Sequence, residues 1–126
     1  MAQFLGGMAG SVATVRQRSS DEPALADPHP AISWLVARLA AIPAVERVVL
    51  FGSRARGDAD ADSDYDVAVF LRGMADRWGE MHRLAEIETD ILYDTGASVH
   101  ALPYRDGFWR ERTPLMHEVR RDGIDL

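Results

Sequence analysis

From residue 31 onward, apolar positions recur at spacings that predict helices and strands in turn. A helix is expected over residues 31–42, where Pro30 suits the first turn and Pro43 ends the run. Its inward face carries Ile32, Leu35, Val36, Leu39 and Ile42. A longer helix is expected over residues 74–93. Its stripe comprises Trp78, Met81, Leu84, Ile87 and Ile91. A last helix is expected to begin at Thr113 as N-cap and to end at Gly123.

Three apolar runs between these helices predict β-strands. "RVVLF" and "YDVAVFL" are almost continuously apolar, which is typical of strands covered on both faces, and "SVHALPY" is a third candidate. The order is helix, strand, short helix, strand, long helix, strand, helix. It predicts an α/β or α+β fold, with a small mixed sheet and helices packed mainly on one face.

The first 30 residues differ in composition from the rest. They are rich in Gly, Ser, Ala and Pro, and few large apolar side chains follow Leu5. We expect residues 1–30 to form a flexible N-terminal tail, with a short docked helix or strand as the alternative. The folded domain is then expected over residues 31–126.

The charge balance excludes some function classes. The net charge is −6 and the pI is about 5.1. This argues against extended nucleic acid as a partner, since such binding needs surplus basic charge, but a single nucleotide held with metal ions remains compatible. The chain has no cysteine, so disulfides and thiolate metal sites are excluded. It shows neither a membrane-length apolar run nor a secretory signal, so we expect no membrane association and a cytoplasmic location.

One segment of the sequence indicates a function: residues 51–70, "FGSRARGDADADSDYDVAVF". A strand that ends in Gly52-Ser53 before a helix-prone segment presents backbone N–H groups that suit a phosphate. Arg54 and Arg56 lie beside this turn and are suited to phosphate oxygens. The alternatives are an ordinary serine cap and solvated arginines.

Asp64 and Asp66 open the second strand of this stretch. Side chains two residues apart on a strand point to the same face, so two like charges would repel there. A divalent cation between them removes the conflict, and Mg²⁺ prefers such oxygen ligands. The alternative is a solvated acidic loop that runs into the strand. A phosphate cradle and a metal pair in one crevice together suit phosphoryl-type transfer.

These residues resemble a known family. Gly52-Ser53, ten residues, and then Asp64-Tyr65-Asp66 match the G-S-x10-D-x-D signature of the polymerase-β-like nucleotidyltransferases. The best resemblance is to the minimal nucleotidyltransferase (MNT) group, over about residues 31–126. It implies a polymerase-β-like core, with Gly52, Ser53, Arg54, Arg56 and Ser63 binding the nucleotide and with Asp64 and Asp66 as catalytic Mg²⁺ ligands.

The resemblance also implies an activity and a partner. Members of the family transfer a nucleoside monophosphate to a hydroxyl with the help of Mg²⁺, and for this chain the expected group is AMP from ATP. Many MNT proteins resemble antitoxins of HEPN-domain toxins, and some adenylylate the toxin. A chain of this size leaves no room for an acceptor domain, which favours a protein acceptor in a homo-oligomer or hetero-oligomer.

The sequence departs from the family pattern on the third strand. Active members usually carry a third carboxylate there, but "SVHALPY" offers Ser98, His100 and Leu102 on the matching face. His100 is a candidate substitute as base or ligand, and a structural role is the alternative. The second function hypothesis is therefore a weak or inactive nucleotide-binding antitoxin that neutralises its toxin by binding alone. Phe108 and Trp109 are expected to pack on the core, with base stacking as the alternative.

Overall fold

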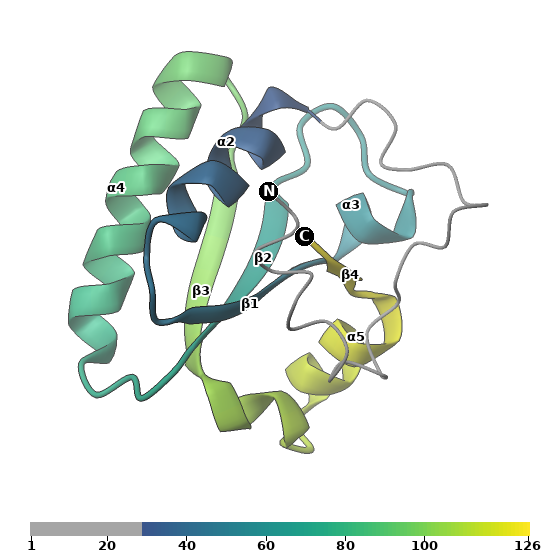
Figure 1. Ribbon diagram of the computed structural model, residues 1–126. Helices are drawn as coiled ribbons and strands as arrows, with labels where there is room; N and C mark the ends of the chain where they lie inside the picture. Colours follow the sequence, from purple (N-terminus) through teal and green to yellow (C-terminus); the bar gives the residue numbers. More distant parts are fainter. Residues whose placement is uncertain (1–28) are drawn as a thin grey trace.

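The computed structural model describes residues 29–126, as helices around one sheet (Figure 1). In chain order, the elements are α2 (Pro30–Ala40), β1 (Val45–Phe51), α3 (Ser53–Arg56), β2 (Tyr65–Leu71), α4 (Arg77–Thr95), β3 (Val99–Arg105), the 3-10 helix η2 (Asp106–Arg110), α5 (Pro114–Asp122) and β4 (Ile124–Asp125). The tail expected over residues 1–30 falls almost wholly on residues 1–28, which lie outside the described residues.

The sheet has four strands in the order β3-β2-β1-β4. β1 pairs antiparallel with both β2 and β4, whereas β2 and β3 run parallel, and the long helix α4 provides the crossover that parallel neighbours need. The expected α/β class with a mixed sheet is therefore confirmed. Two pairs in the strand register determine where the candidate site lies. Phe51 lies opposite Asp66, and Asp66 lies opposite His100.

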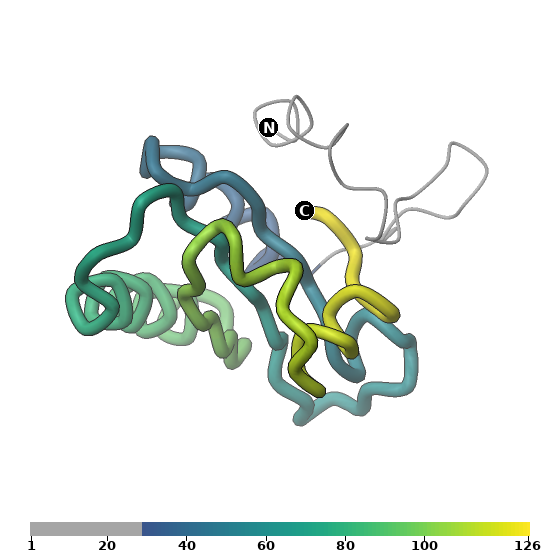
Figure 2. Tube along the Cα trace, turned by 90° about the horizontal axis from the view of Figure 1, so that it is seen from below, coloured from purple at the N-terminus to yellow at the C-terminus, as the bar shows by residue number. Residues whose placement is uncertain are grey.

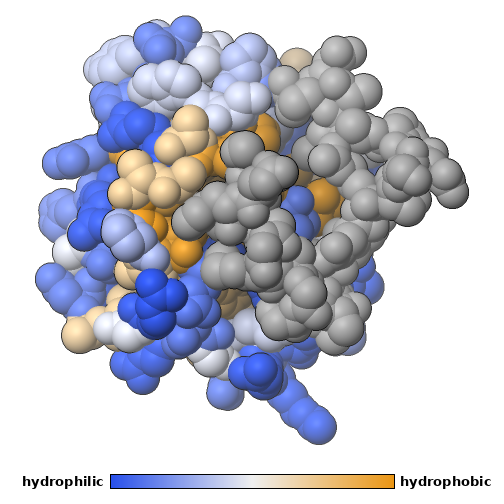
Figure 3. All heavy atoms as spheres, in the orientation of Figure 1, coloured by the Kyte–Doolittle hydropathy of each residue, from blue (hydrophilic) through white to orange (hydrophobic). Residues whose placement is uncertain are grey.

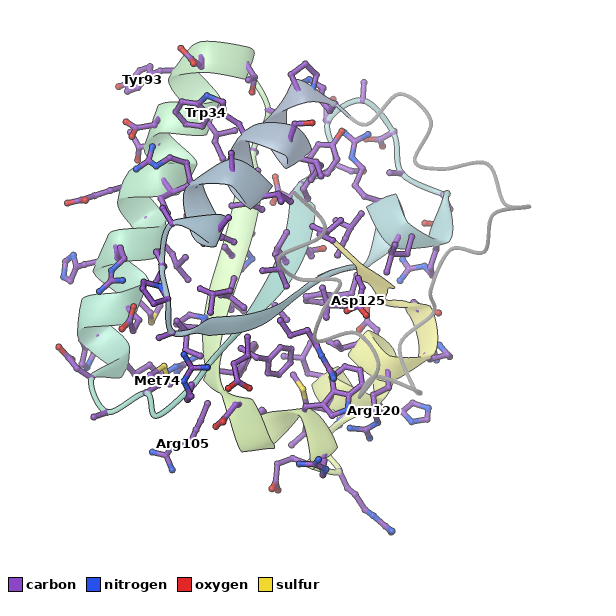
Figure 4. All side chains as sticks on the ribbon, in the orientation of Figure 1. Trp34, Met74, Tyr93, Arg105, Arg120 and Asp125 are labelled. Carbon is purple, nitrogen blue, oxygen red and sulfur yellow. The ribbon has the colours of Figure 1, made fainter. Side chains whose placement is uncertain are left out.

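Helices α2 and α4 cover one face of the sheet. Their buried side chains Leu35, Leu39, Leu84, Ile87 and Ile91 pack on Val48, Leu50, Val67 and Val69. In Figure 3, hydrophobic residues reach the surface beside α2 and are bordered by hydrophilic ones. Trp34 lies between α2 and α4 in Figure 4, and the Arg38 guanidinium lies 5.3 Å from its ring centroid.

The opposite face of the sheet is covered by η2 and α5. Figure 2 shows that these two elements lie apart from α4. The buried residues there are Val49, Phe51, Ala68, Phe70, Tyr104, Trp109, Met116 and Val119. The Arg120 side chain joins the two covering elements, because its Nη1 donates to the carbonyls of Trp109 (2.6 Å) and Glu111 (3.0 Å). Strands β1 and β2 are thus buried on both faces, which explains their nearly continuous apolar sequence.

Most expected element ends are confirmed to within two residues, but the long helix begins at Arg77 and not at residue 74. Thr113 Oγ1 caps α5 by accepting from Met116 N–H at 3.0 Å, and Gly96 ends α4 in a left-handed conformation. Trp109 is buried, and the Phe108 ring stacks on Tyr104 at 5.3 Å, so both aromatics pack as expected. Trp78 does not join the inward stripe of α4, since 74% of it is exposed in the first turn. Among residues 29–126, no helix is both long and apolar enough to cross a membrane.

The outer edge of β3 is blocked by side chains. Glu88 of α4 accepts the Ala101 N–H at 2.7 Å, and Pro103, two residues on, has no N–H to offer. The Pro103 carbonyl accepts from Arg77 Nε at 3.4 Å. An incoming strand would therefore find no free N–H group at residues 101 and 103, which disfavours strand addition at this part of the edge.

We expect Glu88→Gln to become more stable relative to wild type as the pH rises. Burial raises the pKa of Glu88, although the Ala101 hydrogen bond and His100 oppose the shift. The folded state therefore holds this proton more tightly than the unfolded chain does, and wild type loses stability as pH rises through the carboxyl range. Glutamine keeps the acceptor and does not titrate, so the stability gap should widen between about pH 4 and pH 7.

The measurement is the free energy of unfolding in urea, taken at several pH values for both proteins. Glu86→Gln, at an exposed position on the same helix, controls for general loss of negative charge. A gap that stays constant or narrows with rising pH would contradict the expected cost of burying the Glu88 charge.

Candidate active site

The turn between β1 and α3 is built around Gly52. Its φ of +74° is a conformation that other residues rarely adopt, and a Cβ there would lie 2.5 Å from Asp66 Oδ2. The Gly52 carbonyl accepts from the N–H groups of Ala55 and Arg56, both at 3.0 Å, which starts the short helix. The bend therefore lies directly against a carboxylate, and Ser53 opens α3 beside it as a half-buried residue.

Arg54 organises the acidic loop that joins α3 to β2. Its guanidinium donates to the Ser63 carbonyl at 3.0 Å and 3.3 Å and to the Ala61 carbonyl at 3.4 Å. It also lies 4.3 Å from the Tyr65 ring centroid. Ser63 Oγ accepts the Asp60 N–H at 3.0 Å, within the loop itself. Arg54 and Ser63 thus brace the loop that delivers the two aspartates.

Arg56 connects α3 to the C-terminal helix. It forms ion pairs with Asp58 (3.2 Å), with Glu118 of α5 (3.4 Å) and with Asp122 of α5 (3.7 Å). The hydrogen bond to Asp58, together with these charges, raises the pKa of Arg56. The cradle turn is therefore held against α5 by charge, through a side chain that is 37% exposed.

Asp64 and Asp66 lie at the start of β2, but their surroundings differ. Asp64 precedes the strand and is exposed, whereas Asp66 lies within it and 34% of its side chain is exposed. Burial raises the pKa of Asp66; the Asp64 and Glu118 charges add to this, and His100 opposes it. The Asp66 carboxylate is thus the more enclosed of the pair, in a negative environment that favours a bound cation.

His100 is the β3 residue beside Asp66. Its Nδ1 lies 3.8 Å from Asp66 Oδ1, and 58% of its side chain is exposed. His100 occupies the place opposite Asp66 in the register of the two parallel strands, so both side chains lie on the same face of the sheet. This is the strand face on which the sequence offered histidine rather than a third acid.

Glu118 is a residue that the sequence did not single out. It lies on the helix that covers this face, and its charge acts on Asp66. The only signal was its place on α5, next to the buried Val119. Its contact with Arg56 spans 62 positions along the chain, so no local pattern predicts it.

The chemistry of these donors fits a divalent cation with a phosphorylated ligand. Asp64 and Asp66 offer hard carboxylate oxygens, and the Gly52 turn lies against one of them. Within the part of the chain that the structure describes, no group of three or more His, Asp or Glu residues is arranged to hold a metal. Any bound ion would therefore take part of its ligands from the substrate or from water.

Comparisons with known proteins bear on the fold and the family of this chain. The chain is similar in fold to a crystal structure of a toxin-antitoxin with AMP-PNP, at 23% identity over 74% of this chain and 69% of that one, with a TM-score of 0.54. It is also similar to a mutant of the toxin-antitoxin MntA-HpeT, at 22% identity over 79% and 70% of the two chains, with a TM-score of 0.52. No curated protein matches it in sequence. Residues 32–120 match the family described as "Nucleotidyltransferase domain", and the chain belongs to that family.

Proposed function

We propose that this chain is a Mg²⁺-dependent nucleotidyltransferase that moves AMP from ATP to a hydroxyl group of a protein partner. The partner is a HEPN-domain toxin, which makes the chain an MNT-type antitoxin. The observation that carries the proposal is the approach of Gly52 to Asp66, because it joins a glycine turn that suits a phosphate to an acidic residue at one end of the central strands β1 and β2.

Each residue at this end of β1 and β2 has a role in the proposal. The Gly52-Ser53 turn holds the triphosphate, and Arg56 adds positive charge beside it. Asp64 and Asp66 hold Mg²⁺, which when bound neutralises charge on the phosphates as the bond breaks. The partner's hydroxyl oxygen forms the new bond to the α-phosphorus, its proton passes to a base or water, and pyrophosphate leaves.

In this proposal, another molecule supplies the acceptor. The described helices are committed to the two faces of one sheet, and His100 and Asp64 remain exposed beside Asp66. A docked protein can therefore bring its hydroxyl to the exposed side of Asp66. The structurally similar proteins described as toxin-antitoxin assemblies support a toxin in that role.

A second candidate function is neutralisation by binding alone. The observation that favours it is that the described residues hold no group of three His, Asp or Glu suited to a metal. In this case the chain binds nucleotide weakly, or for structural reasons, and covers its toxin without modifying it.

Asp66→Asn should separate these two functions. The purified chain is incubated with ATP labelled at the α-phosphate, Mg²⁺ and the product of the neighbouring gene. We expect label on that partner, and at least about a 100-fold slower transfer by Asp66→Asn, because an amide is a weaker cation ligand. Asp62→Asn, which removes one negative charge from an exposed site in the loop before β2, should transfer at close to the wild-type rate.

Toxin activity is measured in the same samples. Unlabelled partner that both wild type and Asp66→Asn still neutralise would establish the binding-only function. Equal labelling by wild type and Asp66→Asn would remove Asp66 from the reaction.

Gly52→Ala should impair nucleotide binding beyond its effect on backbone strain. With φ 74° and ψ −160°, Gly52 has a conformation that is essentially restricted to glycine and costs an alanine about 1–3 kcal/mol, and the new Cβ would meet Asp66 Oδ2. Gly73→Ala is the control, since Gly73 also has a positive φ (63°) but a Cβ there would meet no atom within 4 Å. Calorimetric titration with ATP and Mg²⁺ should show at least about tenfold weaker binding for Gly52→Ala than for Gly73→Ala. Equal affinities in the two variants would contradict a nucleotide site at this turn.

A further inference from the structure

The pair formed by Asp66 and His100 has a geometry suited to sharing one metal ion. The two residues lie opposite each other on β2 and β3, adjacent strands in Figure 1, and the shortest carboxylate–imidazole distance is 3.8 Å. Two donors that each lie about 2.1 Å from one cation are about 3–4 Å apart. The observed spacing therefore fits a shared ion without movement of either strand.

The backbone that carries His100 is held in place from outside the sheet. Glu88 accepts the N–H of Ala101, the next residue, at 2.7 Å, and the parallel ladder with β2 holds the other side of the strand. A rigid second strand matters because metal affinity depends on how firmly the ligands are supported. His100 is thus fixed in register and not carried on a loop.

The chemistry of the two donors differs from that of a carboxylate pair. Mg²⁺ takes oxygen ligands, whereas imidazole nitrogen favours divalent ions of the first transition series. Asp64 is an exposed carboxylate just before β2. Among residues 29–126, no group of three His, Asp or Glu residues is arranged to hold a metal, so water or phosphate oxygens would occupy the other positions.

We propose that Asp66 and His100 form a mixed carboxylate–imidazole site that binds a first-row transition-metal ion, and that this site prefers Mn²⁺ to Mg²⁺. This inference rests on the proposed function for the identity of the site, and it changes the ion expected there. It also gives His100 a direct role as a ligand.

The test is a titration of the full chain with MnCl₂ alone, in which electron paramagnetic resonance measures free Mn²⁺. MgCl₂ competition then gives the preference. We expect Mn²⁺ to bind at least about tenfold more tightly than Mg²⁺, and His100→Ala to lose at least about tenfold in Mn²⁺ affinity. His82→Ala, which removes an exposed histidine of α4, should bind as wild type does. His100→Asp should shift the preference toward Mg²⁺, because it replaces nitrogen by oxygen.

A spectroscopic readout separates ligation from a structural role. Pulsed resonance of the Mn²⁺ complex should show coupling to a histidine nitrogen in wild type and His82→Ala, and none in His100→Ala. Unchanged Mn²⁺ affinity in His100→Ala, or wild-type spectra without nitrogen coupling, would overturn the inference.

The two proposals fail separately. Label transfer that depends on Asp66 but uses an ion without nitrogen coupling would leave the proposed function standing and reject the mixed site. Mn²⁺ held through His100 in a chain that labels no partner would support the mixed site and reject the transferase.

Discussion

The close approach of the Gly52 backbone to the Asp66 carboxylate is the constraint on which the site depends. A side chain at residue 52 would occupy the space of Asp66 Oδ2, so only glycine allows β1 to end beside the start of β2. The antiparallel register makes this meeting unavoidable, because Phe51, the preceding residue, lies opposite Asp66. The turn that begins α3 and the acid that begins β2 are thus parts of one feature.

The position of the site follows from where the cover of the second face ends. Along β2, the side chains on that face are Phe70 and Ala68, buried under η2 and α5, and then Asp66, which is partly exposed. β3 shows the same progression from the buried Tyr104 to the exposed His100. The polar positions are reached only beyond the last packed aromatic, so hydrophobic burial stabilises the strands that carry the site without enclosing it.

Local patterns in the sequence predicted the strands and the helix caps, because each depends on neighbouring residues. Strand period alone places Asp66 on the face opposite Val67, and Gly96 ends α4 through its own backbone freedom. The exposed Trp78 was missed because helical spacing does not reveal where the sheet under α4 ends. The contacts of Arg56 with Glu118 and of Glu88 with Ala101 join distant segments, so they depend on tertiary packing.

The negative charge around Asp66 favours a bound cation whenever a phosphorylated ligand is present. Asp64, Asp66 and Glu118 are negative, and Arg56 is already paired with carboxylates of its own loop and of α5. In a chain of net charge −6, a bound triphosphate would meet repulsion that the positive charge of Arg56 alone does not offset. An imidazole at residue 100 brings no negative charge, so this end of the strands is less negative than a third carboxylate would make it. The attraction for a hard ion such as Mg²⁺ falls accordingly, and ligand chemistry then weighs more than charge in deciding which ion binds.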